Sequence, residues 1–514
     1  MVLALYDCRS KQEYIYRTNK IKEISGGSAL LASVYEMFIY EAEKNGITFF
    51  CNGKWANREF SLNEFEKSEK KAVVVYIGGG NLMVIYKDKE DYINANKIFS
   101  RLMLEKTYTI NVISAYTEVT GDFKGDRSRL YAQNAKNKNV GMISMPWTVF
   151  PFTQVDPRTY MPVVMKDSSK QESLSRESVL KCEKYSDDHR SVVDEKLKAI
   201  YLDDLSYERG EESILAVIYI DGNNMGAKIK DLLDKENSYN ECINKIRTFS
   251  IQTDRDFVDS PIKAIEKALL EKRCAWEEKN KADGKKRRSY FKYRKVIAGG
   301  DEITLICNAR MVPIILETYF DALNSEESGN YACAGVALFH SHAPFSKVYE
   351  IAEQCCESGK KRSRAYDSKA NFVDFHYCRA GITNNMETIR DEQEKDLTAR
   401  PFLYGEPGVE CRSDINDIRF DDFEAFGKLL AGTDDVGDGV GRANIKELAA
   451  SLLTNHSKYE FEMIRIRSRL TKDEYKELVG KMYPETDEKK KEVEKLLFDI
   501  AQVYDLWFAT ERGE

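Results

Sequence analysis

Short apolar runs and amphipathic helical patterns alternate along the chain, and the same alternation occurs twice. Each copy has a short strand, a helix, a glycine-interrupted hairpin, a second helix and a final strand. The strands and hairpins of the two copies are expected at residues 3–6, 73–86 and 109–117, and at residues 214–220, 295–306 and 331–339. Apolar residues at three- and four-residue spacing predict helices at residues 29–43, 91–104, 262–271, 311–323 and 348–358.

The order of these elements, βαββαβ, is typical of ferredoxin-like domains. In such a domain the first strand lies antiparallel beside the third, so the end of the first strand meets the turn between the second and third. The spacing along the sequence is similar in the two copies. Asp7 precedes Gly80 by 73 residues, and Asp221 precedes the corresponding residue, Asp301, by 80. The sequence therefore predicts an α+β fold with two ferredoxin-like domains.

The rest of the chain predicts a connector between the copies and a helical region after them. Residues 141–210 hold four of the ten prolines and a polar run, which is typical of a connector with little core of its own. After about Arg390, apolar residues recur at helical spacing and predict a C-terminal α-helical bundle. The predicted domains are residues 1–145, the connector 146–212, the second ferredoxin-like domain 213–390 and the helical domain 391–514.

Composition narrows the class of protein. The 514 residues are 42% hydrophobic and 32% charged, which fits a globular protein and excludes collagen-like or broadly disordered chains. The longest apolar runs, residues 72–77 and 214–220, fall far short of the roughly 20 residues of a membrane helix. The 11 cysteines form no CxxC pair, and charged residues interrupt any N-terminal signal core. We therefore expect a cytoplasmic protein that does not enter a membrane.

Three carboxylates are expected to gather at the hairpin of the second copy, because the predicted strand pairing brings Asp221 to Asp301 and Glu302. Like charges in such proximity require cations. Mg²⁺ prefers carboxylate oxygens, water and phosphate as ligands. Two Mg²⁺ or Mn²⁺ ions, about 3.5–4 Å apart, would activate a hydroxyl and stabilise a leaving pyrophosphate. The sequence thus predicts a two-metal site formed by Asp221, Gly222, Asp301 and Glu302.

Glycines beside these acids predict a nucleotide site. Gly299 and Gly300 permit positive φ at a tight hairpin and let a ligand approach the backbone. The turn at residues 221–226 leads into a helix, whose N-terminal amides suit phosphate. A plain hairpin with polar tips is the alternative, since the motif is short. In the first copy the hairpin reads Gly-Gly-Gly-Asn and only Asp7 remains, so we interpret that copy as a degenerate partner domain.

Six stretches of the chain resemble the motifs of one protein family and follow one another in the same order as in that family. They read DCRSKQEYIYRTNKIKEISGGSALL (7–31), DDLSYERGEESILAVIYIDGNNMG (203–226), AGGDE (298–302), CAGVALFHSHAPFSKVYEIAEQCCESGKK (333–361), FVDFH (372–376) and ARPF (399–402). Together they resemble the palm-domain large subunit of type III CRISPR effector complexes (the Csm or Cmr large subunit), the cyclic oligoadenylate synthetases related to GGDEF nucleotide cyclases. The resemblance covers about residues 1–405.

The resemblance implies two palm domains that join NTPs, with ATP as the first candidate, by attack of a 3′-hydroxyl on an α-phosphate. The second palm would be catalytic and carry the metals on Asp221, Asp301 and Glu302. By motif position it implies nucleotide contacts at Asn223, Asn224, Gly226, Gly299, Gly300, Lys360 and Lys361, and a second nucleotide pocket at Gly26, Gly27 and Ser28. A solvated helix face is the alternative for the two lysines.

Departures from the family are equally informative. No HD dipeptide occurs, so the DNase activity of many relatives is not expected. Residues 151–157 stand where relatives carry a cysteine-rich knuckle, and Cys182 is isolated, so no zinc is predicted. The hairpin reads GGDE where many relatives have two aspartates, which leaves the product open. The chain resembles a compact, stand-alone member whose trigger need not be a CRISPR RNA.

A basic loop stands out against the net charge of −7, which itself argues against wholesale wrapping of nucleic acid. Residues 281–295 hold eight basic residues and one acid. Their cations could bind phosphate while the interleaved aromatic rings stack on bases. The candidate nucleic-acid contacts are Lys285, Lys286, Arg287 and Arg288. A solvated loop is the alternative.

Three hypotheses about function follow. The first is a Mg²⁺-dependent nucleotidyltransferase that makes a cyclic oligonucleotide second messenger in antiviral defence. The second is a nucleotide-binding sensor or scaffold without turnover, and the third is an RNA-binding subunit of a CRISPR-type effector. The sequence leaves open the base preference, the product, an RNA or nucleotide activator, and homo-oligomer formation.

Overall fold

A computed structural model describes residues 1–140, 150–167, 172–188, 195–197, 199, 202–206, 213–282, 289–324, 329–378, 386–412, 417–432, 439–471 and 473–508. Contacts divide the chain into two compact units. The N-terminal unit is Met1–Ile200, Asn224–Ser260 and Lys295–Ile303, and the C-terminal unit is Tyr201–Asn223, Pro261–Arg294 and Thr304–Glu514. Both units thus contain segments of the second copy. This division follows contacts rather than the repeat, and the four boundaries expected from the sequence stay predictions.

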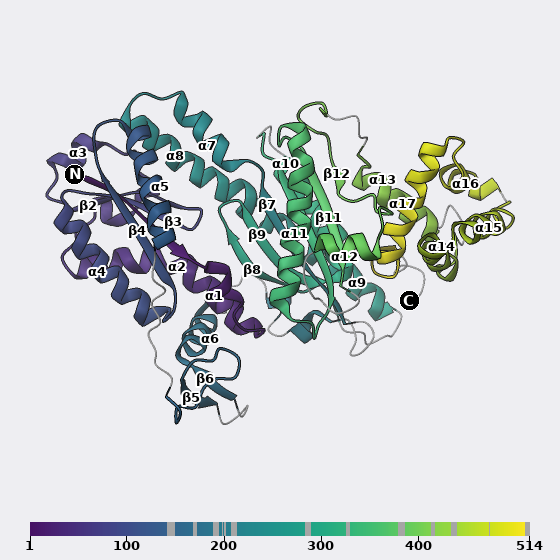
Figure 1. Ribbon diagram of the computed structural model, residues 1–514, viewed down its shortest axis with the longest axis horizontal. Coiled ribbons are helices and arrows are strands. Elements are labelled where there is room, and N and C mark those ends of the chain that lie inside the picture. Colours follow the sequence, from purple (N-terminus) through teal and green to yellow (C-terminus); the bar gives the residue numbers. More distant parts are fainter. Residues whose placement is uncertain are drawn as a thin grey trace. The chain divides into compact units, whose positions relative to one another are not determined.

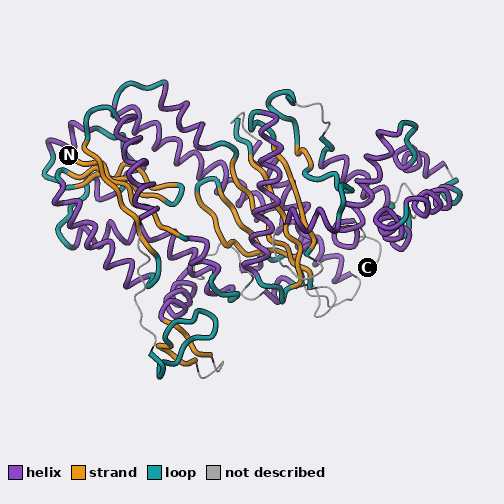
Figure 2. The backbone as a smooth tube through the Cα atoms, in the orientation of Figure 1, coloured by secondary structure: helices purple, strands orange, loops and turns teal. Residues whose placement is uncertain are grey.

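The N-terminal unit contains an antiparallel sheet in the order β2-β3-β1-β4 (Figure 1, Figure 2). Its strands are β1 (Val2–Arg9), β2 (Ala72–Gly78), β3 (Asn81–Tyr86) and β4 (Asn111–Glu118). The first strand lies beside the third, with Asp7 opposite Asn81. This confirms the strand order predicted for the first copy, in which the end of the first strand meets the hairpin.

Helices cover both faces of this sheet. They are α1 (Lys11–Tyr16), α2 (Ile21–Lys44), α3 (Leu62–Lys67), α4 (Lys89–Lys106) and α5 (Phe123–Val140). Successive residues of a strand point to opposite faces. Tyr6 packs against Phe38 of α2 and Phe99 of α4, with ring centroids 5.4 and 5.2 Å away. On the other face, Leu5 joins a buried cluster with Leu130 of α5.

A helix pair from the second copy completes the second face of the same sheet. α7 (Met225–Asp234) and α8 (Tyr239–Thr253) follow the first strand of that copy and belong to the N-terminal unit. Ile243 and Ile246 of α8 lie in the buried cluster with Leu5. The Arg247 guanidinium donates to the carbonyl of Val75 at 2.7 Å. The second copy therefore contributes two helices to the core of the first sheet.

The connector has more structure than its composition predicted. Strands β5 (Val163–Asp167) and β6 (Glu172–Ser175) pair antiparallel and lead into α6 (Arg176–Asp188). Met161, Leu174 and Val179 are buried. α6 packs closely on α2, because a Cβ added to Gly26 would lie 1.8 Å from the carbonyl oxygen of Lys181. These connector residues therefore form regular elements that pack on α2, and the connector expected at residues 146–212 stays a prediction.

The second sheet has the order β12-β11-β10-β7-β9-β8. Its strands are β7 (Ile214–Gly222), β8 (Tyr293–Gly299), β9 (Glu302–Asn308), β10 (Ala332–His340), β11 (Asn371–Tyr377) and β12 (Phe402–Tyr404). Four strands, β8-β9-β7-β10, repeat the order of the first sheet, as predicted for the second copy. β11 joins β10 in parallel, and β12 joins β11 antiparallel. β12 lies in the range expected to be helical.

The helices of the C-terminal unit include three that periodicity predicted and a set that follows the second sheet. They are α9 (Ser260–Ala282), α10 (Val312–Asn324), α11 (Phe345–Ser363), α12 (Met386–Gln393), α13 (Phe420–Ala431), α14 (Arg442–Thr454), α15 (His456–Arg467), α16 (Lys476–Met482) and α17 (Asp487–Val503). The ring of Phe423 packs 4.6 Å from that of Phe402, which anchors α13 on the sheet. From Phe420 onward the described elements are all helices, and the helical domain expected at residues 391–514 stays a prediction.

A buried ion network also ties the last long helix to the sheet. Arg400 and Asp499 are fully buried, and Arg400 Nε lies 2.9 Å from Asp499 Oδ1. The Arg400 guanidinium also pairs with Glu394 at 3.0 Å and contacts the carbonyl oxygen of Phe375 in β11. Burial of such charges is tolerated only where each finds a partner. Within the described ranges, no helix has the length and hydrophobicity of a membrane span.

Candidate functional site

Asp221 lies near the end of β7 and forms an ion pair with a lysine side chain. Lys360 of α11 places Nζ 2.5 Å from Asp221 Oδ2 and 3.0 Å from the carbonyl oxygen of Gly222. Both side chains are about a quarter exposed, at 26% and 21%. Burial lowers the pKa of Lys360, but the charge and hydrogen bond of Asp221 raise it more, so the net pKa is raised. The ammonium therefore stays charged at neutral pH.

The first sheet contains an equivalent pair. Lys138 of α5, the helix that follows the fourth strand, forms an ion pair with Asp7 at the end of β1. Lys11 lies 3.5 Å from the same carboxylate and donates to the carbonyl oxygen of Gly80 at 2.7 Å. A strand-one aspartate paired with a lysine of the helix after strand four is thus a feature of the repeat. In the first copy a second lysine is added beside the hairpin.

The hairpin of the second copy is fixed by a contact that the sequence did not indicate. Gly300 has φ +66°, as expected, whereas Gly299 has no left-handed φ. The Gly300 amide donates to Asp254 Oδ1 at 2.5 Å. A Cβ on Gly300 would lie 3.8 Å from the Cα of Gly79, so the glycine turns of both copies approach each other within the N-terminal unit. Burial raises the pKa of Asp254, and the Gly300 amide opposes this shift.

The two acids of the GGDE motif follow this turn. Asp301 lies in the turn itself and Glu302 opens β9, the strand next to β7 in the sheet order. Burial lowers the pKa of Lys228 in α7, and the negative charge of Asp301 partly opposes this. Lys228 was missed by the sequence interpretation, although it lies one turn into the helix that follows the Gly-Asn-Asn segment. Asp254 was missed because no motif surrounds it.

The residues expected to contact nucleotide after β7 differ in their surroundings. Asn223 is buried, and its amide donates to Ser363 Oγ at 3.1 Å and to the carbonyl oxygen of Ala370 at 2.9 Å. Asn224 is exposed, left-handed and immediately before α7. A Cβ on Gly226 would meet open space. Asn223 thus has a role in the fold, and the nucleotide contacts of all three residues stay predictions.

Lys361 and the second predicted pocket lie in other contexts. Lys361 is exposed and pairs with Glu387 of α12 at 2.9 Å, whereas Lys360 pairs with Asp221. Gly26 is packed against the Lys181 backbone and Gly27 lies against its side chain, while Ser28 is half-buried. The glycines therefore have a packing role in α2. The nucleotide pocket proposed for Gly26, Gly27 and Ser28 stays a prediction.

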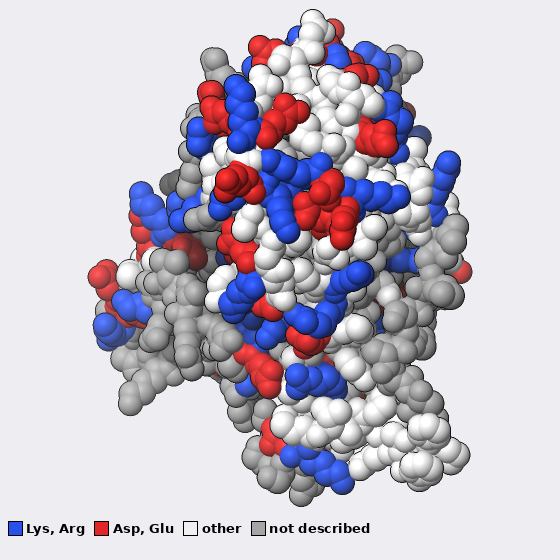
Figure 3. Space-filling view, turned by 90° about the vertical axis from the view of Figure 1, so that its left-hand side faces the viewer, with Lys and Arg blue, Asp and Glu red and all other residues white. Residues whose placement is uncertain are grey.

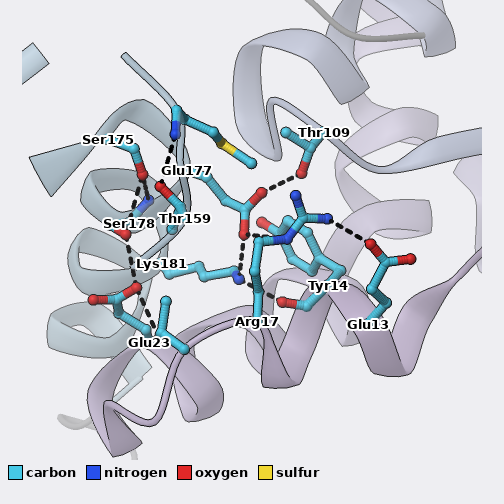
Figure 4. A network of polar contacts seen from close by, with 12 residues as sticks. Glu13, Tyr14, Arg17, Glu23, Thr109, Thr159, Ser175, Glu177, Ser178 and Lys181 are labelled. Atoms are coloured by element: carbon cyan, nitrogen blue, oxygen red, sulfur yellow. Dashed lines mark hydrogen bonds and ion pairs between the residues drawn. The ribbon is translucent and has the colours of Figure 1, made fainter. Parts of the chain in front are cut away.

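A buried polar network surrounds this helix contact (Figure 4). Lys181 is fully buried, and its ammonium pairs with Glu177 at 2.6 Å and contacts the carbonyl oxygen of Tyr14. Ser178 donates to Glu23 at 2.7 Å. Burial lowers the pKa of Lys181, while Glu177 raises it. Because each buried charge here has a partner, the network fixes α6 on α1 and α2.

Replacing Gly26 with alanine is expected to destabilise the protein. The added methyl group would overlap the Lys181 backbone, and overpacking of this kind costs about 1–3 kcal/mol or more. The matched control is Gly480→Ala in α16, where a Cβ meets open space. Thermal and urea unfolding should show a large loss for the first variant and none for the second. Equal stability of both variants would contradict the packing role.

Two other predictions from the sequence are the basic nucleic-acid contacts and the metal ligands. The basic residues Lys285, Lys286, Arg287 and Arg288 lie outside the described residues. On the face drawn in Figure 3, Lys and Arg side chains are interspersed with Asp and Glu. Across the described ranges, no group of three or more His, Cys, Asp or Glu side chains is arranged to hold a metal ion. The metal ligands expected from the sequence stay predictions.

Comparisons with known proteins give the fold. No family model matches the sequence, and no curated protein matches it. Three solved structures align over 98% of this chain and 69% of theirs: a Csm1–Csm4 cassette with cA4 (TM-score 0.52, 13% identity), Csm1 of T. onnurineus (0.53, 12%) and a Csm1–Csm4 cassette with AMPPNP (0.50, 12%). Nearly the whole length of this chain therefore shares the fold of Csm1.

Proposed function

We propose that the chain is a metal-dependent nucleotidyltransferase that joins nucleoside triphosphates into a cyclic oligonucleotide second messenger in antiviral defence. One observation carries the proposal: at the end of β7, Asp221 and the Gly222 carbonyl already bind a cation, the Lys360 ammonium. The order of the second sheet supports it, because β9 begins with Glu302 and lies next to β7. In the equivalent strands of the first sheet, Asp7 is opposite Asn81.

The donor set fits Mg²⁺ or Mn²⁺ in its chemistry. Asp221 and Gly222 offer a carboxylate and a carbonyl oxygen, and Asp301 and Glu302 offer further carboxylates of the kind that Mg²⁺ prefers. We propose these four residues as the metal site of the second palm. Two bound ions would activate the 3′-hydroxyl and stabilise the leaving pyrophosphate.

The chain's own groups would position the nucleotide. The raised pKa of Lys360 keeps its ammonium charged, so it can neutralise a triphosphate beside Asp221. Asn224 leads into α7, whose first amides point toward the start of the helix and suit phosphate oxygens. Asp254 holds the Gly300 amide and thereby fixes the turn that carries Asp301. We propose the first palm as a partner domain, because two lysines neutralise its Asp7.

ATP is the first substrate to test, because the solved Csm1–Csm4 cassettes contain cA4 or AMPPNP. The purified full chain is incubated with each of the four NTPs and Mg²⁺ or Mn²⁺, with and without RNA, and products are separated by chromatography. We expect pyrophosphate release and a cyclic oligonucleotide from ATP. Absence of any product under every condition, together with phage resistance that does not depend on Asp301, would exclude this function.

Substitution of Lys360 tests the role of its ammonium. Lys360→Gln is expected to raise the KM for ATP by about 10- to 100-fold, because a charge-assisted hydrogen bond contributes about 1.5–3 kcal/mol. Lys347→Gln, on the same helix and paired with Glu350, is the matched control and should leave KM unchanged. Lys361→Gln should have a smaller effect than Lys360→Gln, since Lys361 pairs with Glu387. An unchanged KM for Lys360→Gln would contradict the assignment.

A non-catalytic nucleotide sensor is the second candidate, and one contact favours it. The Lys360 ammonium occupies both oxygens proposed for metal on β7, and a lysine that stays there would make a metal-free site. The first copy gives a precedent, with lysines around Asp7. Calorimetry distinguishes the two functions: tight ATP binding in EDTA, without turnover in Mg²⁺, would favour the sensor.

A further inference from the structure

A second cavity lies at the far end of the strands that carry the proposed site. Its volume is about 710 Å³, and Ile214 and Asn308 are among the residues that line it. Ile214 begins β7 and Asn308 ends β9, whereas Asp221 and Glu302 lie at the other ends of these strands. At about 3.3 Å per residue, Ile214 and Asp221 are roughly 23 Å apart. The cavity is therefore separate from the proposed nucleotide site and lies wholly within the C-terminal unit.

The wall formed by the C-terminal helices carries excess positive charge. Arg442 and Lys446 of α14 line the cavity together with Asp505, and each cation lies 2.5 Å from an oxygen of that carboxylate. Arg310 from the sheet side adds a third cation to the lining. Glu394 also lines the cavity, but its carboxylate is already paired with the buried Arg400 at 3.0 Å. Three cations, Arg310, Arg442 and Lys446, and two carboxylates, Asp505 and Glu394, thus line the cavity.

Two buried polar residues, His376 and Glu394, also line the cavity. His376 and Glu394 are each 5% exposed, and neither His376 Nδ1 nor Glu394 Oε2 has a hydrogen-bond partner among the described residues. Burial, followed by the charge of Arg400, lowers the pKa of His376 to about 4, so the imidazole is neutral at neutral pH. A neutral imidazole offers one donor and one acceptor. His376 Nδ1 lies 3.7 Å from Glu394 Oε1, and Glu394 Oε2 lies 3.5 Å from Arg390 Nε, so these atoms have ionic neighbours inside the protein. The imidazole of His376 lines the cavity and can exchange a hydrogen bond with a polar molecule bound there.

We propose that this cavity binds a small oxyanion, a phosphate or carboxylate compound no larger than a mononucleotide. Its volume falls within the roughly 300–1,000 Å³ of small-molecule sites. Arg442 and Lys446 bind the oxyanion, and His376 hydrogen-bonds to the rest of the ligand. Because the ligand contacts both the sheet and α14, it stabilises the docking of the C-terminal helices. This site is independent of the proposed nucleotidyltransferase activity.

The experiment is isothermal titration calorimetry on the full chain, with a thermal-shift assay in parallel. The probes are inorganic phosphate, AMP and citrate, each compared with sodium chloride at equal ionic strength. We expect at least one probe to bind and to raise Tm, and the tightest of the three identifies the source of the oxyanion. In Arg442→Gln/Lys446→Gln the dissociation constant should rise by about tenfold or more, because two charged contacts are lost.

A control pair and a second background complete the test. Lys428→Gln/Lys490→Gln removes two cations that pair elsewhere on α13 and α17, and should bind as the wild type does. His376→Gln keeps hydrogen-bonding groups without the imidazole and should weaken the tightest probe. Binding should persist in Asp301→Asn, whatever that variant does to turnover. No binding by any probe, or an equal loss in the control pair, would overturn the proposal.

Discussion

Asp301→Asn is expected to abolish the formation of cyclic and linear products from ATP, while the protein remains folded. The substitution keeps the size of the side chain at the tip of the hairpin and removes the charge proposed to hold metal. Stabilisation of charge by a bound metal contributes several kcal/mol to the transition state. At 1.36 kcal/mol per tenfold, the rate should fall by at least about 10²–10³-fold. Product formation is measured by chromatography and by pyrophosphate release.

Two comparisons separate this effect from a general loss of structure. Asp231→Asn removes an exposed acid of α7 and should leave turnover unchanged. Asp221→Asn should be as inactive as Asp301→Asn, because both carboxylates belong to the same proposed site. Wild-type turnover by Asp301→Asn, at an unchanged Tm, would rule out a metal role for this residue and leave the sensor as the better function.

The arrangement of strands could be predicted because each copy contains local sequence signals for its strands and turns. Short, continuous apolar runs mark β1 and β7, and glycines mark the turns of both hairpins, so the strand order followed from a known motif. The packing of α8 on the first sheet could not be predicted in the same way. The apolar face of a helix indicates that Ile243 and Ile246 are buried, but it does not tell which sheet buries them.

For the candidate site, too, the sequence predicted the positions of residues within their elements but not their contacts with distant segments. Local sequence places Asp221 at a strand end and Asp301 in a turn, and the resemblance drew attention to Lys360. The partner of Lys360 depends on how α11 crosses β7, which no local pattern specifies. Asp254 illustrates the same limit: it reaches the Gly300 amide from a helix 46 residues earlier in the chain. Contacts between distant segments therefore account for most of what was missed.

The repeated aspartate and lysine pair suggests how the two copies diverged. In both sheets the helix after the fourth strand supplies a lysine to the strand-one aspartate. The first copy adds Lys11, which bridges Asp7 and the Gly80 carbonyl. The second copy instead has Asp301 and Glu302 at the hairpin, so negative charge replaces a lysine there. A change of local charge, rather than of fold, accounts for the difference proposed between a partner palm and a catalytic one.

Asp499→Ala is expected to lower the free energy of unfolding by about 3–5 kcal/mol, the usual cost of removing one partner of a buried ion pair. Asp499 Oδ1 lies 2.9 Å from Arg400 Nε, and Asp499 Oδ2 accepts the Ala399 amide at 2.8 Å. Without this carboxylate, the fully buried Arg400 retains Glu394 as its partner but loses charge balance. Urea unfolding of the full chain measures the loss.

The control and the pH dependence make this prediction specific. Asp487→Ala, at the exposed start of the same helix, removes an ion pair with Lys490 and should change stability little, because solvent screens an exposed pair. Burial raises the pKa of Asp499 to about 6, with Arg400 opposing, so the folded state keeps this proton at a pH where the unfolded chain has lost it. The contribution of Asp499 to stability is therefore largest below about pH 4 and falls as the pH rises to about 6. Asp499→Asn cannot titrate, so the free energy of unfolding of the wild type should fall relative to that of this variant between about pH 4 and pH 6. If the difference between the two free energies rises or stays constant across this interval, the carboxyl group of Asp499 does not retain its proton in the folded state.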